Sequence, residues 1–143
     1  MGTFIGGMAS KDGQVVQTGQ GGRTGTYKIG DTGPGGGMVF YVEGKGGMEV
    51  SISLGNHTWN DAINVAKNYR GGGKSDWRLP SLEELNLIYV NLQKAGLVNF
   101  PSGWYWSSSQ SSTYLAWSQV FGDGRQSNDL KDNTFSVRAV RAF

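Results

Sequence analysis

The densest group of charged side chains in this chain lies in the stretch KNYRGGGKSDWR, residues 67–78. Four of these residues are cationic and only Asp76 is anionic. Three consecutive glycines let side chains and backbone amides come close to a bulky anion, to which arginine and lysine donate charge-assisted hydrogen bonds. The stretch is therefore a candidate anion site, against the alternative that its charges are simply solvated. Its cations are Lys67, Arg70, Lys74 and Arg78.

Other cations are scattered along the chain. Lys45 lies between two early apolar runs, and Arg125 and Lys131 lie in a late polar segment. The chain has 13 basic and 11 acidic residues, which gives a formal net charge of +2. So small an excess does not indicate a nucleic-acid partner, and any basic surface must arise from local clustering.

Catalytic chemistry finds little support in the residue types. His57 is the only histidine, and the chain has no cysteine. No serine lies in the glycine pattern of a nucleophile elbow, and GPGGG lacks the Lys-Ser/Thr that completes a phosphate-binding loop. Glu83 and Glu84 are neighbours on one expected helix, so they do not form the facing carboxylates of a glycosidase. We expect no catalytic residues, no cofactor and no enzyme; a hydrolase is the least favoured alternative.

A metal site is not expected either. Trp59-Asn60-Asp61 matches a triplet of calcium-dependent lectins, but it lies inside an expected helix and its usual partner triplets are absent. Calcium needs several converging oxygen ligands. Five late Asp and Asn side chains could supply them, although an acidic turn cluster is the commoner meaning of such a group. These are Asp123, Asn128, Asp129, Asp132 and Asn133.

Two strands are expected ahead of the basic stretch. MVFYV (38–42) is typical of a buried strand, and it follows the turn cluster GDTGPGGG (30–37). MEVSIS (48–53) alternates, which predicts that Val50 and Ile52 face inward. GKGG between the two runs favours a hairpin.

Two helices are expected, one on each side of the three glycines. Thr58 is a candidate N-cap for the first helix. In DWRLPSLEEL (76–85), Ser81 and Glu84 have the spacing of a capping box, which begins the second helix. We expect Trp77 to wedge between this helix and the sheet, and Arg78 to bind a carbonyl or a carboxylate. The expected buried residues are Trp59, Ala62, Ile63 and Ala66 of the first helix, and Leu82, Leu85, Ile88 and Leu92 of the second.

The last third of the chain is strand-like. WYWSSS (104–109), LAWSQVF (115–121) and FSVRAVRAF (135–143) are aromatic or β-branched runs, and residues 122–133 form a long loop or an irregular hairpin tip. The order of strands, helices and strands predicts an α+β fold with both helices on one side of a twisted antiparallel sheet. Residues 1–26 are expected to form a flexible Gly-rich arm ahead of a body over 27–143. No apolar run has the length of a membrane span, so no membrane insertion is expected.

Six ordered blocks resemble the C-terminal domains of the Legionella collagen-like adhesin (Lcl) family over about residues 27–143. Many members of that family carry cysteines near the first helix; this chain has none, so no disulfide is carried over. The blocks are IGDTGPGGGMVFYV, the helix beginning at TWNDA, GGGKSDWRLPSLEELNLIY, GWYWSSS, AW followed by F, and VRAVRAF.

The resemblance implies a C-type-lectin-like fold without the calcium site of that fold. It also implies a secreted or bacterial surface adhesin with a preceding collagen-like stalk, whose end would be the glycine triplets at 19–25. Such a domain is expected to be a homotrimer that binds sulfated glycosaminoglycans or another polysaccharide of a host or bacterial cell surface. Three copies of a modest basic patch gain avidity for a sulfated polymer. We therefore predict five ligand-facing residues: Arg70, Lys74, Lys45, Arg125 and Lys131.

Two other functions stay open. The domain could be a receptor for a protein or an uncharged ligand through its late loop and aromatic residues, or it could only nucleate and cap a trimeric stalk. Lectin-like scaffolds host unrelated functions, so the fold does not decide between these functions. Salt-dependent heparin binding separates the first prediction from the receptor, because recognition of an uncharged ligand does not depend on ionic strength.

Overall fold

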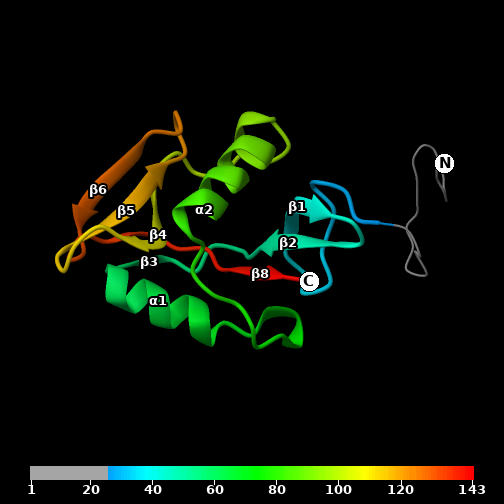
Figure 1. The fold of residues 1–143 in the computed structure, drawn as a ribbon, viewed down its shortest axis with the longest axis horizontal. Helices are drawn as coiled ribbons and strands as arrows, with labels where there is room; N and C mark the ends of the chain where they lie inside the picture. The colour runs from blue at the N-terminus through cyan, green and yellow to red at the C-terminus, as the bar shows by residue number, and fades with distance from the viewer. Residues whose placement is uncertain (1–25) are drawn as a thin grey trace.

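The computed structural model describes residues 26–143, which form an α+β structure (Figure 1). The arm predicted over residues 1–26, with its glycine triplets, lies outside the described residues except for Thr26. In chain order the elements are β1 (Met38–Glu43), β2 (Gly46–Val50), β3 (Asn56–His57), α1 (Trp59–Asn68), the 3-10 turn η1 (Gly71–Gly73), α2 (Leu82–Ile88), the π-helical turn η2 (Tyr89–Lys94), β4 (Trp104–Gln110), β5 (Leu115–Val120), β6 (Gln126–Leu130), β7 (Phe135–Ser136) and β8 (Val140–Ala142).

The strands form two sheets and not the single antiparallel sheet that we expected. The first has the order β1-β2-β8 and is antiparallel. The second has the order β3-β7-β4-β5-β6 and is mixed, because β4 and β7 run parallel. The C-terminal run was expected to be one strand, but it passes from one sheet to the other. Between β7 and β8, its backbone pairs with residues 51–55 instead, through Val137 and Ala139.

The hairpin expected from the first two strands is present. β1 and β2 are joined by Gly44 and Lys45 alone, and Gly44 has φ +60°, which glycine adopts readily. The late polar segment, expected to be a long loop or an irregular hairpin tip, instead contains the strand β6, which pairs antiparallel with β5 over residues 126–130. The prediction for Ile52 is wrong: β2 ends at Val50, and Ile52 is exposed.

The two helices lie on opposite faces of the five-stranded sheet, which corrects the expectation of one side (Figure 1). Successive strand residues point to opposite faces, and β4 shows both. Tyr105 joins the core cluster that contains α2, whereas the next residue, Trp106, joins the cluster that contains α1. The α2 cluster holds Leu85, Ile88 and Leu92 with Phe40 and Phe121; the α1 cluster holds Trp59, Ala62 and Ala66 with Trp77 and Val137.

Local sequence signals position both helix starts. Thr58 occupies the N-cap of α1, although its side chain makes no capping hydrogen bond. The capping box of α2 is confirmed, because Ser81 Oγ accepts from Glu84 N and Glu84 Oε1 accepts from Ser81 N. Gly96 ends the helical segment with φ +78°. Over residues 26–143, no helix is long and apolar enough to cross a membrane.

Candidate anion-binding surface

The predicted basic stretch forms a turn between α1 and α2. We call residues 67–74 the cationic turn. Gly72 and Gly73 have φ values of +65° and +74°, so the chain reverses where other residues would be strained. Gly72 also lies against a second glycine loop, because a Cβ added to it would be 2.3 Å from the carbonyl oxygen of Gly35. The glycines thus allow the chain to reverse, and the close approach of Gly72 to Gly35 also fixes the shape of the turn.

The turn brings Lys67, Arg70 and Lys74 together. Arg70 is exposed, and its Nη1 donates to the carbonyl oxygens of Lys67 (2.9 Å) and Tyr69 (3.0 Å). The guanidinium therefore lies over the carbonyl end of α1, where a helix favours positive charge. None of the three cations forms an ion pair within residues 26–143. Lys74 acts electrostatically on Asp76, two residues away.

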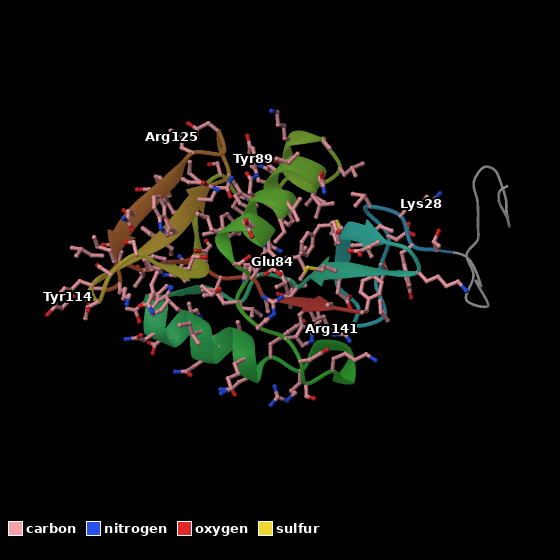
Figure 2. All side chains as sticks on the ribbon, in the orientation of Figure 1. Lys28, Glu84, Tyr89, Tyr114, Arg125 and Arg141 are labelled. Atoms are coloured by element: carbon pink, nitrogen blue, oxygen red, sulfur yellow. The ribbon has the colours of Figure 1, made fainter. Side chains whose placement is uncertain are left out.

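A buried charge network lies beneath the cationic turn. Glu49 is fully buried and accepts from Arg141 Nη1 at 2.6 Å. Arg141 Nε donates to Asp76 Oδ1 at 2.7 Å, and this carboxylate is 58% exposed (Arg141 is labelled in Figure 2). The hydrogen bond from Arg141 lowers the pKa of Asp76, which therefore keeps its charge. Asp76 is thus held in a fixed position at the end of the turn.

The glycines of GDTGPGGG hold the other side of Glu49. Gly35 N and Gly37 N donate to its two carboxylate oxygens at 2.8 Å and 2.7 Å. A Cβ on Gly33 or Gly35 would lie 2.5 Å or 2.7 Å from those oxygens, so side chains do not fit there. Sequence reasoning missed Glu49. The available signal was the alternate spacing of glycines 33, 35 and 37 ahead of a strand that contains a lone acidic residue.

Arg78 has the structural role that we predicted, but the prediction for Trp77 is wrong: it packs with α1 and not between α2 and the sheet. Trp77 is buried in the α1 cluster, and its Nε1 donates to the carbonyl oxygen of Gly71 at 3.0 Å. The Arg78 guanidinium donates to both carboxylate oxygens of Glu84 at 2.7 Å. Trp77 therefore ties the cationic turn to the core, and Arg78 belongs to the helix start.

The other three predicted ligand-facing residues lie elsewhere. Arg125, near the β5–β6 turn, pairs with Asp123 at 2.8 Å, far from Arg141 in Figure 2. Lys131 Nζ donates to Gln110 Oε1 (2.7 Å) and to a backbone carbonyl, and it lies 4.3 Å from the centre of the Trp59 ring. Lys45 lies in the β1–β2 turn, next to the pairing of Gly47 with the C-terminal residue. Arg70 and Lys74 thus lie on one short turn, whereas Arg125, Lys131 and Lys45 lie on other elements.

The late Asp and Asn residues are engaged within the β5–β6 region. Asp129 Oδ2 accepts from Ser118 Oγ at 2.7 Å, and Asn128 Oδ1 accepts from Ser111 Oγ at 2.6 Å. Across residues 26–143, no group of three or more His, Asp or Glu side chains is placed to hold a metal ion. His57 Nε2 lies 2.7 Å from the carbonyl oxygen of Leu54.

Comparison with family models agrees with the resemblance that the ordered sequence motifs indicate. The family model of the Lcl C-terminal domain matches residues 43–141, which include both helices and the cationic turn. A comparison with curated proteins finds no match. The matched region covers well over half of the chain, so this protein belongs to the Lcl C-terminal domain family, whose name refers to a collagen-like adhesin.

Proposed function

We propose that this domain is a surface adhesin module that binds sulfated glycosaminoglycans, with the cationic turn as its principal contact. The observation that carries the proposal is the group of three cations without ion pairs at Lys67, Arg70 and Lys74. Four of the other eight cations in residues 26–143 are engaged by protein groups. Arg78, Arg125 and Arg141 are paired with carboxylates, and the ammonium of Lys131 is shared between two acceptors.

A rigid support increases what such a turn contributes to binding. Side chains that are already held in place lose less conformational entropy when a ligand binds. The backbone of the turn is fixed by the indole of Trp77 on Gly71, by the contact of Gly72 with Gly35, and by the bond of Arg141 to Asp76. The backbone that carries its cations is therefore held in a defined position.

Several finer features belong to the proposal, and the resemblance to the family is what suggests them. They are a C-type-lectin-like fold without a calcium site, a homotrimer on a collagen-like stalk, a secreted or bacterial surface location, and the absence of enzyme activity. A trimer triplicates the cationic turn, so a polymer that spans two or three copies gains avidity. Lys45, Arg125 and Lys131 stay predicted as secondary contacts along such a polymer.

Heparin chromatography against sodium chloride tests the proposal. The variant carries Arg70→Gln and Lys74→Gln, and a matched control carries Lys28→Gln and Lys94→Gln, which removes the same charge from two exposed lysines elsewhere. We expect the first variant to elute at lower salt, and the slope of log affinity against log salt to fall by about two ionic contacts. The control should stay close to wild type. Equal elution of all three proteins would refute the cationic turn as the site.

One observation favours the alternative of a receptor for an uncharged or protein ligand. Tyr114 is 73% exposed and Leu130 is 56% exposed, at one end of the β5–β6 hairpin. Trp117 on the same hairpin is only half-buried and belongs to neither core cluster. If this surface carries the function, ligand binding would be insensitive to salt and would be lost in Tyr114→Ser. Sedimentation would test the trimer in either case.

A further inference from the structure

Arg138 differs from the other arginines of the described chain. Arg78, Arg125 and Arg141 each form an ion pair with a carboxylate, and Arg70 is exposed to water. Arg138 is half-buried, and no carboxylate pairs with it anywhere in residues 26–143. Removal of a charge from water costs free energy, and arginines that are fully buried are almost always paired.

The contacts of Arg138 leave most of its donors without a protein partner. Nη1 donates to the carbonyl oxygen of Ser51 at 3.1 Å, and the guanidinium carbon lies 4.4 Å from the centre of the Phe100 ring. The guanidinium also interacts with the Tyr105 hydroxyl and acts to lower its pKa, although burial of that hydroxyl outweighs this effect and raises the pKa. The Nε of Arg138 is buried and has no hydrogen-bond partner. A guanidinium has five N–H donors in a planar fork, so the protein satisfies only part of this group.

Both groups that hold Arg138 are themselves rigid. Ser51 is fixed to Ala139, because Ser51 N donates to the Ala139 carbonyl and Ala139 N donates to Ser51 Oγ, each at 2.8 Å. Phe100 is fixed to Gln93, whose Oε1 accepts from Phe100 N at 2.7 Å. The arginine is thus positioned in advance while its charge remains uncompensated. An arginine held in this way is suited to bind an anion.

We propose that Arg138 binds an oxyanion, a sulfate or a carboxylate, of an acidic glycan. The planar fork matches the two oxygens of such a group, and the Phe100 ring holds the plane of the guanidinium. The site is separate from the cationic turn, because Phe100 belongs to the α2 cluster whereas Trp77 and Arg141 lie on the α1 side. The inference rests on the proposed function only for the identity of the glycan.

The buried Nε–H gives a direct spectroscopic reporter. We would assign the arginine Nε–Hε signals of the wild-type protein by NMR, with Arg138→Lys to identify the signal of Arg138. The protein would then be titrated with inorganic sulfate, with acetate, with a sulfated heparin oligosaccharide and with an unsulfated uronic-acid oligosaccharide. We expect the Arg138 signal to move and to saturate with at least one of the two oligosaccharides. Comparison of the responses of the Arg138 signal to inorganic sulfate and to acetate shows whether the site binds a sulfate or a carboxylate.

Arg138→Lys also tests the geometry of the fork. Lysine keeps the positive charge but cannot donate two parallel hydrogen bonds, so we expect affinity for the preferred oligosaccharide to fall about tenfold. The matched control is Arg125→Lys, an exposed arginine paired with Asp123, which should bind as wild type does. The titration of the wild-type protein decides the matter even if Arg138→Lys is less stable.

The outcomes separate this inference from the proposed function. If heparin is retained through the cationic turn while the Arg138 Nε–H signal stays unmoved at saturation, the inference is wrong and the proposed function stands. A buried water on Nε would give that result. If the signal responds to sulfate or acetate but no sulfated glycan binds, the oxyanion site is confirmed and the proposed function is overturned. An Arg138 signal indifferent to all four ligands overturns the site.

Discussion

Replacement of Glu49 by glutamine would remove one charge from the interior and leave the side-chain shape almost unchanged. Glu49 accepts from Gly35 N, Gly37 N and Arg141 Nη1 at 2.8, 2.7 and 2.6 Å. Glutamine has one acceptor oxygen, so its NH2 group must face at least one of these donors. An unsatisfied buried donor costs about 1–3 kcal/mol. A broken buried ion pair costs about 3–5 kcal/mol. Because Asp76 still pairs with Arg141, we expect a total loss of about 3–4 kcal/mol.

Urea denaturation of four proteins measures this loss and its origin. They are the wild type, Glu49→Gln, Arg141→Met and the double variant. Removal of Arg141 leaves Glu49 buried without its cation, and Glu49→Gln leaves Arg141 paired with Asp76 alone. The double variant should therefore lose less stability than the sum of the singles, by about 1–3 kcal/mol. Glu43→Gln, at an exposed carboxylate of β1, should change stability by less than about 0.5 kcal/mol. A Glu49→Gln variant within about 1 kcal/mol of wild type, or additive single costs, would refute the network.

Further expected outcomes concern the glycine contact and the helix start. Gly72→Ala should cost at least about 2 kcal/mol, because the added Cβ meets the Gly35 carbonyl, whereas Gly73→Ala should cost only the left-handed strain of about 1–2 kcal/mol. Equal unfolding free energies of the two variants would show that the structure accommodates the added Cβ of residue 72 against the Gly35 carbonyl without further cost. Burial tends to raise the pKa of Glu84, but hydrogen bonds from Arg78 and from backbone N–H outweigh it and lower the pKa. The stability from Glu84 is therefore present above its unfolded pKa of about 4.3 and is lost as the pH falls through the lower folded pKa. Glu84→Gln should flatten acid denaturation in that range; an unchanged profile would contradict this.

The sequence predicted the helix starts because their signals are local. The capping box needs only Ser81 and Glu84, three residues apart, and both hydrogen bonds form as the spacing requires. Glu49 could not be found in this way. Its partner Arg141 is 92 residues away, and only the order β1-β2-β8 places β8 beside β2. The same order makes β2 a central strand, so Glu49 and Val50 are both buried and simple alternation fails.

The division of the C-terminal run between two sheets is likewise a tertiary effect. FSVRAVRAF has the composition of one continuous strand, but hydrogen bonds from Val137 and Ala139 to residues 51–55 redirect it. The candidate site, too, could be predicted from the sequence only in part. Residue type identified the cations, yet only the fold shows that Lys131 packs on Trp59 whereas Lys74 packs on no aromatic ring of residues 26–143.

The two ends of the described chain share one corner of the molecule. The rings of Tyr27 and Phe143 are 4.9 Å apart in an edge-to-face contact, and Phe143 pairs with Gly47. A label, bead or fusion partner attached after Phe143 would therefore project from the same place as anything attached ahead of Tyr27. The β5–β6 hairpin, at the far side, would face outward with either attachment, so immobilised protein would present one orientation to whatever it meets.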